Sequence, residues 1–258
     1  MPEGDTIRYA VSRMRPALEG RIPDEIATPQ ARHTMDRWPE RLGGRAVRSI
    51  DAHGKHLFLR FEGGLTLHSH LRMRGAWAVH DRGGRWRRSP RRAWLVIRTP
   101  THEIVEFDGP VLELLTDSRT RFDQRLRALG PDVLAESGFD SEQFLRRLRE
   151  DDPGRGIGDA LLDQRTVAGI GNVWRAEACW SAGVDPWRSA GNVSDADALA
   201  IIDHARSRME DSVRTGRPPR RSVYERSGQP CPRCGQAIRA RGQGDDNRTT
   251  FWCPGCQR

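Results

Sequence analysis

The sequence predicts an α+β chain made of several small domains. Short apolar stretches with strand-like alternation fill residues 45–115, stretches with helical spacing follow residue 131, and four of the five cysteines gather near the C-terminus. Hydrophobic residues account for only 36% of the 258 residues, which suits several thin cores better than one thick core. We therefore expect an N-terminal β-sandwich or barrel-like domain, then a helical domain, then a C-terminal metal-binding finger.

The chain begins with a motif suited to nucleophilic chemistry, Met1-Pro2-Glu3-Gly4. Because Pro2 is small, we expect an aminopeptidase to remove Met1 and leave a secondary amine at the chain end. Such an amine has a pKa near ~8, and its attack on a sugar carbon gives a cationic iminium that draws electrons from neighbouring bonds. Glu3 places a carboxyl group beside it as a proton donor. The alternative is that Met-Pro is only a common chain start.

An amphipathic helix is expected over residues 5–19, since its apolar positions recur every three to four residues, at Ile7, Val11, Met14 and Leu18. Strands follow, separated by glycine and proline: 47–50, 57–61, 65–68, 77–79, 93–98, 103–107 and 111–115. The arginine-rich stretch 80–92 is interpreted as a hairpin tip that faces solvent or a partner.

Four domain assignments follow from these patterns: a catalytic β-sandwich domain at 1–117, a basic linker at 118–130, a helical domain at 131–221 and a finger at 222–258. Within the helical domain we expect helices at 141–150, 157–163, 172–181 and 194–214. Ser194 and Asp197 have the spacing of a cap at the start of the last helix.

The strongest local signal is a pair of Cys-x₂-Cys motifs with 18 residues between them, formed by Cys231, Cys234, Cys253 and Cys256. Four thiolates at this spacing fit a tetrahedral zinc ion with no open position for substrate, so the metal would be structural. Disulfides are the weaker alternative. Residues 237–252 between the motifs are expected to form a hairpin that carries Arg248 at its tip.

Three further stretches suggest phosphate or DNA contacts. Lys55 follows a glycine on a turn, where it can meet a phosphate or simply face solvent. His68 and His70 precede Arg72-Met73-Arg74, where Met73 is either an apolar wedge that unstacks a duplex or a core residue. A second metal on the two histidines would need more ligands.

Asn172 ends the stretch Gly169-Ile170-Gly171-Asn172, where a helix should begin. Bare backbone N–H groups at such a position form an anion site, although Asn172 can also serve as a simple helix cap.

The charge balance favours a polyanionic partner. Lysine and arginine number 43 against 35 acidic residues, a formal charge of +8, which indicates nucleic acid or an acidic membrane surface unless the excess is only a solvated basic face. Lys55 is the one lysine. Arginine cannot readily release a proton, so a lysine at position 55 indicates either that a titratable ammonium group is needed there or that the residue type is due to chance.

No apolar stretch is long enough for a membrane span, and the N-terminus lacks the apolar core of a signal peptide. Clustered cysteines point to a reducing compartment. We therefore expect a cytoplasmic protein with no membrane partner.

Together these pieces resemble the formamidopyrimidine-DNA glycosylase/endonuclease VIII family. Seven stretches match in order along essentially the whole chain: Met-Pro-Glu-Gly at the start, Gly-Lys-His-Leu at 54–57, Ser-His-Leu-Arg-Met at 69–73, Leu-Gly-Pro-Asp at 129–132, Leu-Leu-Asp-Gln at 161–164, Gly-Ile-Gly-Asn at 169–172 and the cysteine motifs ending at Gln257. The Gly4 start and the Leu-Gly-Pro-Asp-Val-Leu run look more like the endonuclease VIII branch, particularly its actinobacterial second type.

The resemblance implies a fold and a reaction. The fold is a β-sandwich, a helix–two-turn–helix domain and a zinc finger. The reaction is excision of oxidised bases from damaged DNA, pyrimidines more than purines. The resemblance also implies that the protein is a monomer, holds one structural zinc ion and is associated with a bacterial nucleoid. The target nucleotide is flipped out, Pro2 attacks C1′, Glu3 protonates the ring oxygen, and elimination then cuts the strand.

The resemblance also assigns roles to individual residues. Lys55 and Arg248 match the groups that hold the phosphates flanking the lesion, and His70 and Asn172 match further phosphate contacts. Met73, with Arg72, matches the loop that fills the space left in the duplex.

Several positions depart from the family pattern. Many members carry glutamate where this chain has Thr6, so Asp5 would have to replace that acid. In endonuclease VIII the residues matching Arg72 and Arg74 are glutamine and tyrosine. The basic residue expected before Leu-Gly-Pro-Asp is shifted, with Ala128 in its place and Arg127 adjacent. These changes bear on opposite-base reading and lesion choice.

Two other classes of protein are compatible with parts of the sequence. One is a zinc-finger DNA-binding paralogue with little catalysis, a hypothesis that intact Pro2, Glu3 and Lys55 disfavour and Thr6 keeps open. The other is a ribosome- or transcription-associated zinc ribbon, which explains only the C-terminal finger.

Overall fold

The computed structural model describes residues 2–33, 35–218 and 220–258. Met1, whose removal the sequence predicts, lies outside the described residues. The chain folds into two compact units. Pro2 and Thr6–Arg127 form the first, and Glu3–Asp5 with Ala128–Arg258 form the second.

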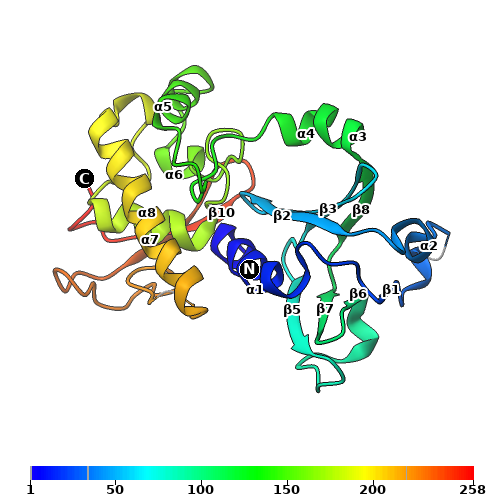
Figure 1. The fold of residues 1–258 in the computed structure, drawn as a ribbon. Coiled ribbons are helices and arrows are strands. Elements are labelled where there is room, and N and C mark those ends of the chain that lie inside the picture. Colours follow the sequence, from blue (N-terminus) through cyan, green and yellow to red (C-terminus); the bar gives the residue numbers. More distant parts are fainter. Residues whose placement is uncertain (1, 34, 219) are drawn as a thin grey trace. The chain divides into compact units, whose positions relative to one another are not determined.

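The first unit contains two four-stranded antiparallel sheets (Figure 1), which confirms the predicted β-sandwich. One sheet has the order β1 (Glu25–Ala27), β6 (Ala93–Arg98), β7 (His102–Phe107), β5 (Ala76–Asp81). The other has the order β2 (Val47–His53), β3 (His56–Phe61), β4 (Leu65–His70), β8 (Val111–Thr116). Each predicted strand lies within an observed one, and β1 is a strand that the pattern did not reveal.

Helix α1 (Gly4–Leu18) contributes the expected apolar face to the core of the first unit. Ile7, Val11, Met14 and Leu18 are all buried there with residues of both sheets, including Leu57 of β3. The core between the sheets therefore needs the helix as well as the strands.

Residues 80–92 do not form the tip of a hairpin. The segment joins β5 to β6, but β7 lies between these two strands in the sheet. The chain therefore has to cross β7 through a longer loop, which ends in the short 3₁₀ helix η2 (Pro90–Arg92).

The segment interpreted as a linker, 118–130, is helical over most of its length. It holds α3 (Asp117–Phe122) and α4 (Gln124–Arg127). The Thr116 hydroxyl accepts from Arg119 N at 3.1 Å, and the Asp123 carboxylate accepts from Arg125 N at 2.8 Å. These caps satisfy donors at the start of each short helix.

The second unit begins with the helices α5 (Ser141–Glu150), α6 (Ile157–Ala160), α7 (Asn172–Ala182) and α8 (Asp195–Thr215). Ser194 caps α8 as expected, accepting from Asp197 N at 3.0 Å. Helix α6 is three residues shorter than predicted, because the Asp163 carboxylate accepts from Arg165 N at 2.9 Å and favours a turn.

The C-terminal hairpin consists of β9 (Arg239–Gln243) and β10 (Arg248–Trp252). Its base shares a small core with α7, formed by Ala176, Trp180, Val223, Cys231, Ile238 and Cys253. Because of this shared core, the finger and the helices pack as one unit.

Two shorter elements, η1 (Ala31–His33) and α2 (Trp38–Leu42), lie before β2, and η3 (Ala190–Asn192) precedes α8. Among the described residues, no helix has both the length and the apolarity that crossing a membrane requires.

Candidate functional site

The Glu3 side chain occupies the N-terminus of helix α7. Its Oε2 accepts from Gly171 N at 2.9 Å and from Trp174 N at 3.3 Å, and its Oε1 accepts from Val173 N at 2.9 Å. Only 2% of Glu3 is exposed. Backbone N–H donors and the positive end of a helix favour an ionised carboxylate over the protonated acid. The anion site predicted at this helix start is therefore filled by a residue of the chain itself.

Two glycines make this approach possible. A Cβ on Gly171 would lie 2.3 Å from Glu3 Cδ, so no larger residue fits without displacing the carboxylate. Gly4 N donates to Gly169 O at 2.9 Å, and a Cβ on Gly4 would lie 3.0 Å from Gly169 Cα. The chain start is thus held by close backbone packing as well as by the carboxylate.

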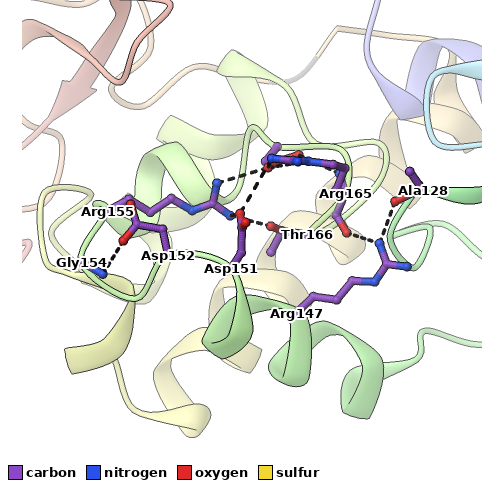
Figure 2. Close-up of polar contacts among 9 residues, drawn as sticks. Ala128, Arg147, Asp151, Asp152, Gly154, Arg155, Arg165 and Thr166 are labelled. Carbon is purple, nitrogen blue, oxygen red and sulfur yellow. Dashed lines mark hydrogen bonds and ion pairs between the residues drawn. The ribbon is translucent and has the colours of Figure 1, made fainter. Parts of the chain in front are cut away.

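The loop before α7 is fastened by arginines. Arg147 Nη1 donates to the carbonyl oxygens of Ala128 at 2.7 Å and Arg165 at 2.5 Å (Figure 2). Arg155 Nη2 donates to Thr166 Oγ1 at 2.7 Å and pairs with Asp151 at 2.9 Å, as Figure 2 also shows. These contacts restrain the loop that delivers Gly169 and Gly171 to Glu3.

Asp5 and Thr6 point to different environments. Asp5 is buried, and its Oδ2 accepts from the Ser212 hydroxyl of α8 at 2.7 Å. Thr6 is exposed. Asp5 therefore has a fixed hydrogen-bond partner on α8, which bears on whether it can replace the acid that relatives carry one residue later.

Lys55 and His70 lie together in the first unit. Lys55 occupies the β2–β3 turn after Gly54, whose φ of +56° suits the tight reversal. His70 ends β4 opposite His56 of β3, and its Nδ1 accepts from Arg72 N at 3.1 Å. Burial, helped by the positive charges of Arg72 and Lys55, lowers the pKa of His70 to about 4. A phosphate would therefore meet a neutral imidazole at His70.

A hydrogen-bonded chain of side chains supports this turn. His68 Nδ1 lies 3.2 Å from Glu113 Oε2, and His68 Nε2 lies 2.8 Å from His56 Nδ1. Burial lowers the pKa of His56 to about 2, so the ring is neutral. With Glu113 accepting from His68, the geometry fits His56 donating to His68. His68 is thus bonded to protein groups at both ring nitrogens.

The loop after β4 exposes its tip. Met73 is 64% exposed, so core packing, one of its two interpretations, is wrong. Arg72 is exposed and has a φ of +49°, an uncommon conformation for a residue with a side chain. An exposed apolar side chain on a turned loop remains suited to insertion between bases.

Asn172 does not cap its helix. Gly171 is the N-cap residue of α7, and Asn172 instead donates from Nδ2 to Thr249 O of the hairpin at 3.0 Å. Its Oδ1 accepts from Arg175 Nη2. Asn172 therefore links the start of α7 to the strand that begins at Arg248.

Arg175 and Glu177 are buried charges that the sequence analysis missed. Arg175 is fully buried and donates to Thr249 O at 2.9 Å and to Gln243 Oε1 at 3.4 Å. Burial lowers its pKa to about 10, so it stays charged at neutral pH. Glu177 accepts from the backbone N–H groups of Ser222, Val223 and Tyr224, each at 2.9 Å.

The signal for both residues was present in the sequence. Two opposite charges, two residues apart, interrupt the apolar pattern of an expected helix. Such an interruption on a buried face requires specific partners.

Arg248 begins β10, directly after the turn of the hairpin, and faces Gln243 in the strand register. Its guanidinium lies 3.2 Å from Asp246 Oδ2, and its side chain is 43% exposed. Arg127, the last residue of α4, is exposed in the first unit. Both side chains are accessible to a polyanion.

The four clustered cysteines form a site for one metal ion. Their Sγ atoms all lie within 4.8 Å of one another, with Cys231–Cys256 at 3.8 Å and Cys234–Cys253 at 3.4 Å. A tetrahedral ion with metal–sulfur bonds of roughly 2.3 Å places sulfurs roughly 3.8 Å apart. Burial and the neighbouring thiols raise the pKa of Cys256 to about 12, whereas the pKa of Cys231 is lowered to about 6, so the four thiols share their protons and a cation is needed to ionise them all.

Two protein-family models match the chain. Residues 1–123 match the model described as "Formamidopyrimidine-DNA glycosylase N-terminal domain", and residues 129–222 match "Formamidopyrimidine-DNA glycosylase H2TH domain". Together the two models cover most of the chain.

Two curated relatives align over the full chain. "Probable endonuclease 8 2" of Streptomyces coelicolor is 41% identical over 100% of this chain and 94% of its own. "DNA-(apurinic or apyrimidinic site) lyase Nei2" of Mycolicibacterium smegmatis is 36% identical over 100% and 99%.

Two solved structures share the fold over 100% of both chains. Lactococcus lactis Fpg in complex with DNA containing an abasic site has a TM-score of 0.83 at 21% identity. The same protein in complex with DNA containing an oxidised pyrimidine has a TM-score of 0.82 at 21% identity. These similarities concern the fold.

Proposed function

Because the chain belongs to the formamidopyrimidine-DNA glycosylase/endonuclease VIII family, it is a DNA glycosylase and abasic-site lyase of base excision repair, and we propose that it acts through a Schiff base on Pro2. Its substrates in this proposal are oxidised bases in DNA, pyrimidines in preference to purines. The preference rests on the likeness to relatives named endonuclease 8.

One observation carries the proposal. The Glu3 carboxylate is buried and receives three backbone N–H groups at the start of α7. Pro2 is the neighbouring residue, so this anchor fixes the end of the chain from which the reactive amine projects.

The reaction then proceeds in balanced steps. The Pro2 nitrogen attacks C1′ of a flipped nucleotide and the damaged base leaves with its bonding electrons. The ionised Glu3 takes the proton that the amine loses and passes it to the ring oxygen as the C1′–O4′ bond breaks. This leaves an iminium between Pro2 and the opened sugar.

Strand cleavage follows from the iminium. Loss of a proton from C2′ sends an electron pair toward the cationic nitrogen, and the bond from C3′ to its phosphate oxygen breaks. Water then hydrolyses the imine and returns the free amine of Pro2. A carboxylate that rests in the ionised form suits the proton transfer, because it can accept before it donates.

Charged and polar groups on both units hold the DNA in this proposal. Lys55, His70 and Arg127 belong to the first unit, and Asn172 and Arg248 belong to the second. Arg72 and Met73 enter the space left by the flipped nucleotide.

We assign the ion at the four cysteines as zinc, since closed sites of four thiolates in small fingers typically hold zinc. Its role is structural, because it fixes the hairpin that carries Arg248. The protein acts as a monomer in this proposal.

Borohydride trapping on a duplex with one abasic site tests the Schiff base. We expect a covalent adduct that mass spectrometry maps to Pro2 in protein from which Met1 has been removed. A variant that retains Met1, such as Pro2→Glu, should form none. If protein with Met1 retained cut abasic strands at full speed, the proposed chemistry would be wrong.

Product analysis on a panel of oxidised pyrimidines and purines tests the substrate preference. Faster excision of purines than of pyrimidines by the same preparation would contradict it, while leaving the Schiff-base chemistry intact.

A further inference from the structure

A cavity of about 440 Å³ lies between α1 and β5 in the first unit, apart from the groups assigned to catalysis. Its lining residues come from α1, from β5 and from the basic loop, which we define as residues 82–92: Tyr9, Ala10, Arg13, Met14, Trp77, Ala78, Val79, His80, Asp81, Gly84, Arg85 and Arg87. We call this cavity the α1–β5 groove. Its size is in the range of specific ligand sites.

Strand β5 forms one wall of the groove with its open edge. β5 is the last strand in its sheet and pairs only with β7 among the described residues. Five consecutive residues, 77–81, line the groove, although successive side chains in a strand point to opposite faces. Continuous lining by a strand therefore means that its backbone edge faces the cavity. Such an edge carries unpaired N–H and C=O groups that can pair with another strand.

The helix supplies the opposite wall. Tyr9, Ala10, Arg13 and Met14 are spaced along one side of α1, and Tyr9 is 38% exposed. Trp77 and Val79 of β5 are only partly buried. A helix beside an open strand edge is the arrangement in which PDZ and PTB domains hold an extended peptide, with the backbone pairing and the side chains entering pockets.

The charges of the groove select an acidic partner. Arg13, Arg85 and Arg87 are exposed, and none of them has an acidic partner within the described parts of the chain. Asp81 is the single acidic residue of the lining. By contrast, Arg88 and Arg92 of the same loop pair with Asp108, at 3.6 Å and 2.5 Å. All three arginines of the lining are thus available to an acidic partner.

We propose that the α1–β5 groove binds an extended acidic segment of a partner protein, which adds to the edge of β5 as an extra strand. The three arginines pair with its carboxylates, and Tyr9, Trp77 and Val79 contact its apolar side chains. Nucleic acid is disfavoured because it has no backbone N–H and C=O groups with strand spacing. A second copy is disfavoured because its groove carries the same three positive charges.

Fluorescence anisotropy with a labelled peptide of alternating glutamate and valine tests the proposal on the full chain. The matched peptide has the same charge, but proline replaces the central valines, which removes N–H donors and prevents strand addition. We expect the first peptide to bind at least tenfold more tightly than the second. Hydrogen exchange should slow in Ala76–Asp81 only when the first peptide is bound. Equal binding of the two peptides would overturn the proposal.

The double variant R13E/R85E should weaken binding of the first peptide at least tenfold. Its matched control, R21E/R91E, makes the same change of net charge at exposed arginines that do not line the groove, and should bind within twofold of the unaltered protein. If both double variants bound the first peptide equally weakly, the loss of affinity would be due to the change in net charge alone, and the proposal would be overturned. R87E, on the exposed loop, replaces R13E/R85E if that variant has a lower melting temperature.

Two further measurements separate this groove from other partners. Abasic-site lyase activity should stay within twofold in R13E/R85E, because neither residue is assigned to catalysis. If undamaged duplex or single-stranded DNA lost as much affinity as the peptide, the groove would be a nucleic-acid site. If sedimentation showed a dimer that R13E/R85E dissociates, the occupant would be a second copy. Either result would overturn the proposal.

Discussion

Glu3 Oε2 lies 2.9 Å from the amide nitrogen of Gly171, although 168 positions separate the two residues in the chain. This contact gives the second residue of the expected mature protein a fixed place at the start of α7. In the proposed reaction it also gives the glycine at position 171 a role, since only a residue without a side chain leaves room for the carboxylate.

Gly171→Ala should therefore lower abasic-site lyase activity by about 100-fold, the effect expected when a reacting group moves by about 1 Å. The added Cβ would lie 2.3 Å from Glu3 Cδ, so the carboxylate must leave its three N–H donors. Single-turnover cleavage of an abasic duplex measures the loss. Gly154→Ala is the control, because its Cβ would meet only the flexible Asp152 side chain at 3.2 Å, and equal activity in the two variants would contradict the role.

The features that the sequence predicted well are set by local chemistry. Ser194 caps α8 because a hydroxyl can reach an N–H three residues on. The four cysteines meet because each pair is held by a short knuckle. Apart from the three-residue β1, the strands of the first unit follow directly from alternation of apolar residues.

The features that the sequence did not reveal depend on partners far along the chain. The N-terminus of α7 was identified as an anion site, but nothing local indicates that Glu3 fills it. Asn172 was interpreted as a possible cap, yet its amide serves the hairpin at Thr249. In the sheet, β7 lies between β5 and β6. Alternation cannot predict this order, because it shows which side chains point to each face of a strand but not which strands pair.

Arg248→Ala should weaken binding of damaged DNA and make it less sensitive to salt. Loss of one phosphate contact lowers the slope of log K against log salt by about 0.9. Fluorescence titrations at several salt concentrations give the slope. Arg239→Ala, an exposed arginine at the start of β9, serves as the matched control on the same hairpin. An unchanged slope in Arg248→Ala would remove this residue from the phosphate contacts.

Arg175→Met should destabilise the second unit. The guanidinium donates to Asn172 Oδ1, Thr249 O and Gln243 Oε1. Its removal leaves Asn172 Oδ1 without this donor, while Thr249 O still accepts from Asn172 Nδ2 and Gln243 Oε1 still accepts from Thr250 Oγ1. A buried group left unsatisfied costs about 1–3 kcal/mol, so we expect a loss of about 2 kcal/mol in the free energy of unfolding.

Chemical denaturation measures the effect of Arg175→Met. Arg214→Met is its control, because the Arg214 side chain is 74% exposed and pairs with Asp211 on the surface, where a loss below about 0.5 kcal/mol is expected. A similar loss in the two variants would show that the network around Arg175 contributes little.

Removal of the metal should unfold the hairpin and abolish DNA binding while the first unit stays folded. Trp180 Nε1 lies 3.4 Å from Cys231 Sγ, so tryptophan fluorescence should report the loss of the ion directly. Elemental analysis should find one zinc per chain, and adding zinc after chelation should restore binding. Cys234→Ser should behave like the chelated protein, whereas Cys179→Ala, at a buried cysteine outside the cluster, should keep its zinc. Full DNA binding without metal would refute a structural role.

Glu106 provides a test of pH dependence in the first unit. It is fully buried, Ser69 Oγ donates to its Oε1 at 2.9 Å, and its Oε2 has no hydrogen-bond partner. Burial raises the pKa of Glu106 to about 8 against the ordinary value of 4.5. Between these two values the folded protein holds a proton that the unfolded chain has released. Stability contributed by this carboxyl is therefore complete below about pH 4.5 and falls as the pH rises toward about 8.

Glu106→Gln should remove that part of the pH dependence, because an amide keeps the acceptor for Ser69 and cannot ionise. We expect the variant to gain stability relative to the unaltered protein between pH 6 and pH 9, by at least about 1 kcal/mol or roughly 2–4 °C in Tm. Melting curves across this range for both proteins measure the difference. Glu62→Gln, at an exposed carboxyl of the same unit, controls for the change of net charge. If Tm changed with pH in the same way in Glu106→Gln and in the unaltered protein, Glu106 would be ionised in the folded state. Only a carboxyl group that stays protonated in the folded protein makes the two pH dependences differ.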